Sequence, residues 1–408
     1  KLSLDFHYRY ETGYDGRAWV ELGGYDPYTG YPYGEILEKI ERNHVYKLFC
    51  RFTQKIAKFE LNLTVCPWEY LPPQAEEVKG EVKMTNCYMV DPGGRVDIPT
   101  ENVYKIWAQQ AEFGNIPIPD GDVTAELVWQ DEQGVIADEG VTVVNASERE
   151  RAYLQIKTAK EGNAVVAMKV NGEIYWSWHI WCTDYEPNVT EGQKFFNNLV
   201  WMDRNLGAMT NEYTIDGGVK GLFYQWGRKD PFPASEGWTD QEKMLYTLTG
   251  TTSLSYKEVD TSENLVAAIR QPARFFIAIT SPGDWYTNSM SLLNRTLWLP
   301  NTKTIFDPCP VGWRVPGNQP WTGLLQGGVF NSYLNGLVHP DAGYFPCTGY
   351  RRPQTGRFDS LGNIVEWFAV ASSSNECYGL IFQSVGVLRK EWSTYWRADG
   401  RSIRCVKE

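Results

Sequence analysis

The chain has 408 residues, enough for roughly two to four domains of about 100–200 residues each. Hydrophobic residues make up 42% and charged residues 22%, a composition that favours folded domains over intrinsic disorder. The formal net charge of -11 argues against nucleic-acid partners, which need a basic face, and against an anionic membrane surface. No apolar run approaches the roughly 18–20 residues of a membrane-spanning helix, so no transmembrane segment is expected in this chain.

Residues 1–75 alternate between apolar and polar residues in the manner of strands, at 2–8, 18–20, 45–52 and 58–65. Three or four strands are too few for a free-standing sandwich. Either strands are missing upstream, or this piece packs against its neighbour. The strand-like start at Lys1, without a visible signal peptide, predicts a truncated or processed end. Pro72-Pro73 and the polar run 74–79 predict a linker.

Residues 76–190 predict a second module, built from short strands separated by Gly, Asp and Asn. These strands are expected at 87–90, 95–98, 124–129, 141–144 and 153–156. A β-hairpin follows, because Asn171-Gly172 is the strongest short hairpin signal and lies between strands at 164–170 and 174–183. The even spacing predicts an immunoglobulin-like sandwich without a helix of useful length.

The second hairpin strand carries bulky residues on both faces, with Trp176 and Trp178 on one and Tyr175 and Trp181 on the other. One face is therefore expected to pack inside its own module and the other against a neighbour. His179 lies within this strand, and we interpret it as a packed or hydrogen-bonded structural histidine.

Residues 191–408 mix short strands with short helices. A strand is expected at 200–202, a tight turn at 221–227 and a final strand at 402–407. A helix is expected at 262–270, with Ser262 as N-cap and Pro272 after its end, and a second near Asn318. The core of this module is predicted to contain Trp201, Trp226, Trp313, Trp367 and Trp396.

The chain carries no sequence motif for catalysis or metal binding. The eight cysteines include no Cys-x-x-Cys, and the four histidines lie far apart without His-Glu-x-x-His. Gly-x-Ser-x-Gly and a phosphate-binding glycine loop are also missing. We therefore predict no catalytic residue, no metal ligand, no cofactor and no enzymatic activity.

A ligand-binding surface is predicted on the irregular loops 284–294 and 344–357, because loops on a rigid scaffold often carry function. Exposed aromatic and arginine side chains suit sugar or peptide ligands. The candidate residues are Trp285, Tyr286, Tyr344, Tyr350, Arg351 and Arg352.

Five segments from residue 162 onward have a common family character. They are GNAVVAMKVNGEIYWSWHIWCTDYEP, NLVWMDRNLGA, GLFYQWGRKDPFP, DPCPVGWRVP and RSIRCVK. Together they resemble the C-terminal portion of fimbrillin-family surface proteins of Bacteroidales, which are tip or accessory subunits of fimbriae. Residues 191–408 alone are similar to the Fibrobacter-type major paralogous domain. That similarity implies a C-type-lectin-like fold related to the formylglycine-generating enzymes. Residues 1–75 look like the end of a fimbrillin β-sandwich.

The resemblance also suggests specific sites, which differ in how well this sequence matches them. The copper-holding pair of neighbouring cysteines of the formylglycine-generating enzymes has no counterpart here. Glu186-Pro187-Asn188 matches the calcium-dependent signature of mannose-type lectins, but it falls at a module junction and is interpreted as a linker turn. In the lectin-like fold a cysteine near the main helix bonds one on the last strand. The resemblance therefore implies a Cys309–Cys405 disulfide, with two reduced buried thiols as the alternative.

The sequence thus predicts a mostly β, multi-domain protein. Two β-sandwich modules, at 1–75 (partial) and 76–190, precede an α+β C-type-lectin-like domain at 191–408. The expected function is cell-surface adhesion by a fimbrial tip or accessory subunit, on a fimbrium (pilus) or outer membrane. Other fimbrial subunits, added by strand addition, and a host or microbial glycan or protein ligand are the expected partners. The first alternative is a free-standing surface glycan-binding lipoprotein of a polysaccharide-uptake system. The second is an enzyme, which a cofactor or a carboxylate pair with perturbed pKa values in a cleft would favour.

Overall fold

The computed structural model describes residues 2–9, 15–22, 44–52, 59–67, 85–109, 113, 116–147, 149, 151–260, 264–317, 319–371, 376–383 and 389–408. The described part is mostly β, with several open sheets and short helices. The chain divides into two compact units, Lys1–Gly80 and Glu81–Glu408. The modules predicted at 76–190 and 191–408 therefore share one compact unit.

The first unit contains two antiparallel strand pairs. β1 (Leu2–Arg9) pairs with β2 (Asp15–Leu22), and β3 (His44–Phe52) pairs with β4 (Phe59–Pro67). The four strands predicted for this segment are therefore confirmed. The predicted linker at 72–79 lies outside the described residues.

The second unit begins with two sheets that face each other across a buried core. The larger has the order β16-β15-β7-β10-β11-β5, and the smaller has the order β6-β9-β8. Their strands are β5 (Cys87–Val90), β6 (Arg95–Pro99), β7 (Val123–Gln130), β8 (Ile136–Val144), β9 (Tyr153–Thr158), β10 (Gly162–Val170), β11 (Glu173–Cys182), β15 (Leu245–Tyr246) and β16 (Thr251–Thr252). β5 pairs with β11 in parallel and forms the end of the larger sheet, whereas β10 and β11 are antiparallel.

The predicted hairpin is confirmed as β10–β11. Asn171 and Gly172 form its turn with φ angles of 51° and 85°, so both adopt the left-handed backbone that this turn requires. Both faces of β11 are buried from Tyr175 to Cys182. One neighbour comes from the C-terminal half, because Ser177 Oγ donates to Asp230 Oδ1 at 2.6 Å.

A helix in this region contradicts the expectation that none would be found. α1 (Glu101–Gln109) buries Val103, Ile106 and Trp107, whose spacing of three to four residues forms one apolar face. Trp107 Nε1 donates to the carbonyl of Tyr175 at 2.8 Å and thereby anchors the helix to β11. A nine-residue helix among alternating strands offers too short a pattern to stand out in the sequence.

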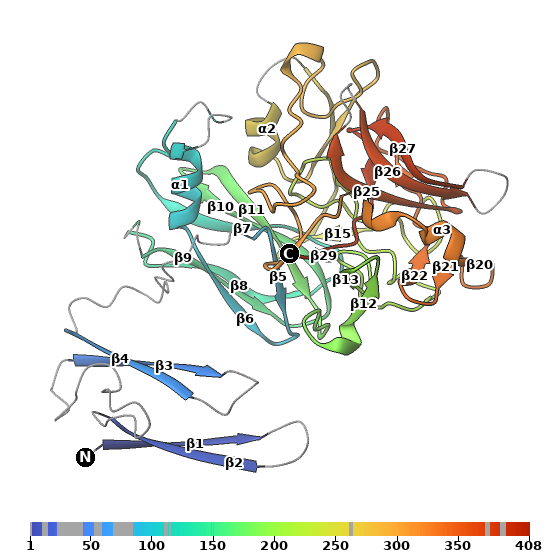
Figure 1. Cartoon of the computed structure of the whole chain (residues 1–408). Helices are drawn as coiled ribbons and strands as arrows, with labels where there is room; N and C mark the ends of the chain where they lie inside the picture. The colour runs from blue at the N-terminus through green and yellow to red at the C-terminus, as the bar shows by residue number, and fades with distance from the viewer. Residues whose placement is uncertain are drawn as a thin grey trace. The chain divides into compact units, whose positions relative to one another are not determined.

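The C-terminal half is assembled from several small sheets (Figure 1). The two four-stranded sheets have the orders β12-β13-β29-β19 and β14-β28-β23-β24. Their strands are β12 (Gln193–Phe196), β13 (Leu199–Met202), β19 (Trp313–Arg314), β29 (Val406–Lys407), β14 (Tyr224–Gln225), β23 (Tyr350–Arg351), β24 (Phe358–Asp359) and β28 (Gly400–Arg401). The strand predicted at 200–202 is confirmed as β13, whereas the predicted last strand is reduced to β29.

The other strands form one pair and two three-stranded sheets, and two short helices accompany them. The strands are β17 (Ser255–Glu258), β18 (Arg274–Ile277), β20 (Val329–Asn331), β21 (Gly336–His339), β22 (Gly343–Pro346), β25 (Asn363–Ala371), β26 (Glu376–Gln383) and β27 (Arg389–Trp396). α2 (Asn264–Arg270) confirms the helix predicted there, although Ser262 lies outside the described residues. The helix predicted near Asn318 is a 3₁₀ turn (Gln319–Trp321) followed by α3 (Leu324–Gly327).

One large apolar cluster joins the two halves of the second unit. It contains Trp129 and Trp176 from the first half together with Trp226 and Trp298 from the second. β15 also extends the larger sheet through the pair Tyr246↔Gln130. Of the five tryptophans predicted for the C-terminal core, four are buried and Trp396 is half-buried. Residues on both sides of the boundary predicted at residue 190 therefore pack into one continuous core.

Candidate functional site

The predicted ligand residues occupy different environments, and three of them are buried. Trp285 is fully buried, and its Nε1 donates to the carbonyl of Trp226 at 2.6 Å. Arg351 is also fully buried, where its guanidinium contacts Glu242 Oε2 at 2.7 Å. Tyr344 is 9% exposed, with its hydroxyl bonded to the carbonyl of Leu334. The expectation that these three side chains lie on an exposed surface is corrected.

The remaining candidates form only a small surface group. Tyr350 is half-buried, and Arg352 carries the most exposed of the six side chains. Tyr350 Oη donates to Asp359 Oδ2 at 3.1 Å, and Arg352 Nε donates to the same oxygen at 2.6 Å. Tyr286 is half-buried against Trp285, with ring centroids 5.9 Å apart. The structure therefore brings together Tyr350 and Arg352, but not the six residues as one site.

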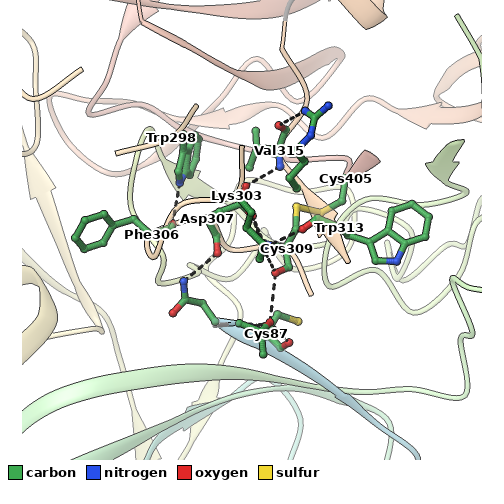
Figure 2. The surroundings of a disulfide bond; sticks show 12 residues. Cys87, Trp298, Lys303, Phe306, Asp307, Cys309, Trp313, Val315 and Cys405 are labelled. Carbon is green, nitrogen blue, oxygen red and sulfur yellow. Dashed lines mark hydrogen bonds and ion pairs between the residues drawn. A yellow bond between two sulfur atoms is a disulfide. The ribbon is translucent and has the colours of Figure 1, made fainter. Parts of the chain in front are cut away.

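Cys309 and Cys405 form a disulfide, the pairing that the resemblance implied (Figure 2). Their Cα atoms are 6.1 Å apart, and 96 positions separate the two residues in the chain. Both residues are fully buried, in the same apolar cluster as Trp298, Phe306 and Trp313. The bond joins the segment before β19 to the segment before β29 and so fixes the last strand of the unit.

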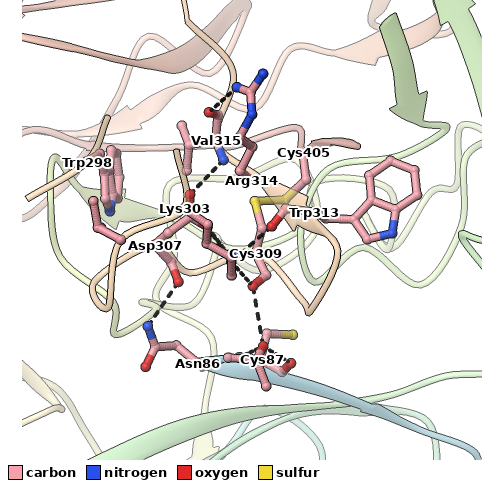
Figure 3. A network of polar contacts seen from close by, with 12 residues as sticks. Asn86, Cys87, Trp298, Lys303, Asp307, Cys309, Trp313, Arg314, Val315 and Cys405 are labelled. Carbon is pink, nitrogen blue, oxygen red and sulfur yellow. Dashed lines mark hydrogen bonds and ion pairs between the residues drawn. A yellow bond between two sulfur atoms is a disulfide. The ribbon is translucent and has the colours of Figure 1, made fainter. Parts of the chain in front are cut away.

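A buried ion pair organises the loop that contains Cys309, and we call residues 303–315 the clamp loop (Figure 3). Lys303 Nζ donates to Asp307 Oδ1 at 2.7 Å and to the carbonyls of Cys309 and Trp313 at 2.6 and 2.9 Å. The second Asp307 oxygen, Oδ2, accepts the backbone N–H of Val315 at 2.9 Å. One carboxylate and one ammonium thus satisfy backbone groups of Cys309, Trp313 and Val315 within the loop.

The first residues of the second unit bind the same loop. Asn86 Nδ2 donates to the carbonyls of Ile305 and Asp307 at 2.8 and 2.9 Å. Asn86 Oδ1 in turn accepts Nε1–H of Trp176 at 3.1 Å, which connects β11 to the loop. Because Asn86 directly precedes β5, these bonds fix the start of the larger sheet.

The last residues of the unit bind the clamp loop from the other end. Arg314 pairs with Val406 in the ladder between β19 and β29, and the N–H of Glu408 donates to the carbonyl of Gly312 at 3.0 Å. The loop therefore holds both Asn86 and Cys405, which stand near the beginning and the end of the second unit. Among the described residues, this network joins three segments that lie far apart in the chain.

Sequence reasoning did not single out Lys303, Asp307 or Asn86. A signal was present, because an Asp two residues before an N–H forms an Asx turn, and the N–H of Cys309 donates to Asp307 Oδ1 at 2.9 Å. The partners at Ile305 and Asn86 lie 219 positions apart, so no local pattern connects them.

Glu186-Pro187-Asn188 begins a turn, in which the N–H of Val189 donates to the carbonyl of Glu186 at 3.4 Å. Across the part of the chain that the structure describes, no three His, Cys, Asp or Glu side chains gather closely enough to hold a metal ion. The described helices include none with the length and apolarity needed to cross a bilayer.

Burial gives one acidic side chain a pH-dependent influence on stability. Glu366 is fully buried beside Arg404, and burial raises the pKa of Glu366 from 4.5 to about 8. The folded chain holds a proton that the unfolded chain releases between these pH values, so the free energy of unfolding should fall as pH rises from about 4.5 to 8.

The substitution Glu366→Gln tests this, because glutamine keeps the shape and does not titrate. The free energy of unfolding of E366Q and of the native chain is measured by urea at pH 5 and at pH 8. Relative to the native chain, E366Q should become more stable between these pH values by several kcal/mol, on the order of 1.4 kcal/mol per unit of pKa shift. Equal pH slopes for the two proteins would show that Glu366 titrates normally.

Comparison of the chain with protein-family models, curated proteins and solved structures finds no match.

Proposed function

We propose that the protein is a cell-surface adhesion protein, a fimbrial tip or accessory subunit that presents residues 191–408 to a host or microbial ligand. The observation that carries the proposal is the clamp loop, which holds the start of the unit through Asn86 and its end through Cys405. An adhesin transmits force between its anchor and its ligand. A covalent and hydrogen-bonded connection of this kind opposes the separation of the first and last strands under load.

Strand order supports the immunoglobulin-like sandwich that the spacing of strands and turns predicts for residues 76–190. Lettered in chain order from β5 to β11, the smaller sheet is B-E-D and the larger is A-G-F-C. The immunoglobulin-like sandwich divides its strands between two sheets in a similar way. The C-terminal half, with its small sheets, short helices and disulfide to the last strand, is proposed to be the C-type-lectin-like domain.

Location and partners follow from the same proposal. Disulfides persist in oxidising compartments, so the Cys309–Cys405 bond favours an exported protein at the cell surface. Subunit partners are proposed to add a strand to the first unit, where β1–β2 and β3–β4 form two-stranded sheets whose outer edges pair with no described strand. A glycan-binding surface lipoprotein outside any fimbria is the second candidate, favoured by the polar pocket described below.

Immunogold electron microscopy of intact cells tests the proposal, with antibody raised against residues 191–408. Gold at filament ends is expected for a tip subunit, and gold along filaments for an accessory subunit. Cells that lack the coding sequence serve as the control for labelling. Gold spread over the cell body without filaments would overturn the fimbrial proposal in favour of the surface lipoprotein.

A further inference from the structure

A polar pocket of about 380 Å³ lies at the junction between the two halves of the second unit. Its walls come from the turns at 131–132 and 160–163, the loops at 207–222 and 234–237, and Lys243. We call it the junction pocket. Small-molecule sites are typically cavities of about 300–1,000 Å³ and often form where domains meet. Its position and size make it a candidate ligand site independent of the predicted loops.

The floor of the junction pocket is a buried carboxylate held in a fixed position. Asp131 Oδ1 accepts the backbone N–H of Asn163 at 2.7 Å, and Oδ2 accepts Asn163 Nδ2 at 2.9 Å. Asn163 is itself fixed, because its Nδ2 also donates to the carbonyl of Gly207 at 3.0 Å and its Oδ1 lies 2.9 Å from His179 Nε2. A carboxylate has about four acceptor sites, so Asp131 retains acceptor capacity for a ligand hydroxyl.

One wall is held by a lysine that is already satisfied. Lys220 is 2% exposed, and its Nζ donates to the carbonyl and hydroxyl of Ser235 at 2.6 and 2.7 Å and to the carbonyl of Gly237. Burial lowers the pKa of Lys220 to about 8. This lysine therefore shapes the wall and leaves Lys243 as the cationic donor nearest Asp131, with Nζ 3.9 Å from Asp131 Oδ2 and 3.1 Å from Glu132 Oε1.

The charges of the lining indicate which ligands fit. Five carboxylates and three lysines line the pocket, and the ammonium of Lys220 is already bonded within the wall. The lining therefore carries a net negative charge and disfavours anionic ligands. It still offers donors and acceptors side by side, which suits a ligand whose hydroxyl groups do both. The carboxylates are Asp131, Glu132, Glu161, Asp216 and Glu236, and the other lysines are Lys160 and Lys243.

An aromatic pair stands beside this polar lining. Trp238, which directly follows Gly237 of the lining, stacks on Tyr213 with ring centroids 5.4 Å apart and planes inclined by 17°. Both rings are half-buried, and Ile215 is 86% exposed beside them in the chain. The ring of Trp238 also lies 5.5 Å from Lys220 Nζ, so the pair stays close to the wall. A partly exposed aromatic side chain next to a cavity lined by donors and acceptors suits the apolar and polar sides of a sugar ring.

We infer that the junction pocket binds an uncharged sugar residue of a glycan, with Trp238 supplying the apolar contact and Asp131 and Lys243 the hydrogen bonds. The inference rests on the proposed surface function and names the ligand class for it. It places binding at the junction of the two halves, away from the predicted loops 284–294 and 344–357.

Glycan-array binding and isothermal titration with the full chain test the inference. The probes are oligosaccharides ending in galactose, glucose, mannose or N-acetylglucosamine, compared with ones ending in sialic or glucuronic acid. Trp238→Ala and Lys243→Gln are each expected to weaken binding of the uncharged glycan at least tenfold. Tyr333→Ala is the matched control, because Tyr333 is a 91% exposed aromatic residue between β20 and β21 with no lining residue next to it in the chain, and it should bind as the native chain does. Circular dichroism melts verify that all variants fold.

Three outcomes would overturn the inference: no uncharged glycan binds, only the acidic glycans bind, or W238A and K243Q bind as tightly as Y333A. These outcomes are separable from failure of the proposed function. Gold at filament ends together with no binding of uncharged sugars would refute the inference about the junction pocket and leave the fimbrial proposal standing. Sugar binding with gold over the cell body would retain the pocket and remove the fimbria.

Discussion

Removing the disulfide with the double substitution Cys309→Ala and Cys405→Ala is expected to lower the free energy of unfolding by about 4–5 kcal/mol. The cross-link closes a loop of 96 positions, and the chain-entropy model assigns a contribution of that size to such a loop. Urea unfolding followed by tryptophan fluorescence measures the change. The midpoint of the transition should shift to a lower urea concentration when both proteins are measured at the same pH.

The matched control is Cys182→Ala with Cys347→Ala, which removes two sulfur atoms that are equally buried and not bonded to each other. This control should lower the free energy of unfolding only by the packing that is lost. The difference between the two double variants therefore gives the contribution of the cross-link. Equal losses for the two would contradict the prediction. Mass spectrometry of natively exported protein provides a direct check, and free thiols at both Cys309 and Cys405 would remove the bridge.

The second large effect is expected from Asp307→Asn in the clamp loop. The carboxylate of Asp307 accepts two backbone N–H groups and Lys303, and asparagine replaces one of its oxygens with an N–H₂ group, which is a donor. The substitution also leaves Lys303 without its carboxylate partner in the interior. Removing one partner of a buried ion pair typically costs about 3–5 kcal/mol. Denaturant unfolding of D307N should therefore show a loss of that order.

Glu101→Gln is the comparison for D307N, because the Glu101–Lys105 pair has the same spacing of four residues but lies on the surface of α1. Exposed pairs contribute about 0–1 kcal/mol, so E101Q should be nearly silent. The double variant Lys303→Met with Asp307→Asn should lose less than the two single variants combined. A D307N loss as small as that of E101Q would show that the buried pair contributes little.

Local chemistry made part of the fold predictable. The hairpin follows from Asn171-Gly172, whose residues tolerate the left-handed backbone of the turn, and α2 follows from an apolar pattern bounded by Pro272. α1 was missed because its nine residues provide barely two turns of periodicity. Local patterns therefore predict elements best where one residue type has a specific backbone role.

Long-range contacts explain what could not be predicted. Arg351 and Trp285 lie in segments rich in Gly and Ser, which favour exposed loops, yet both side chains are buried. Arg351 contacts Glu242, and Trp285 donates to the carbonyl of Trp226. The pairing of Tyr246 with Gln130, which attaches β15 and β16 of the second half to the larger sheet of the first, has no signal in either sequence segment. The junction pocket depends on the same contact between the halves, so its residues could not be grouped from the sequence.

For a chain exported as proposed, the clamp loop also bears on how the second unit can mature. Its partners are Asn86, about two hundred positions earlier, and Cys405, almost a hundred positions later. Folding dominated by such distant contacts is slow, because the loop-closure entropy is lost before those contacts form. Until Cys405 reaches the clamp loop, Cys309 remains an unpaired thiol, and Cys87, which joins the same apolar cluster in the folded unit, is another free thiol. Formation of the correct disulfide therefore requires that Cys309 stays reduced until the last strand arrives, or that a wrong pairing is exchanged for it.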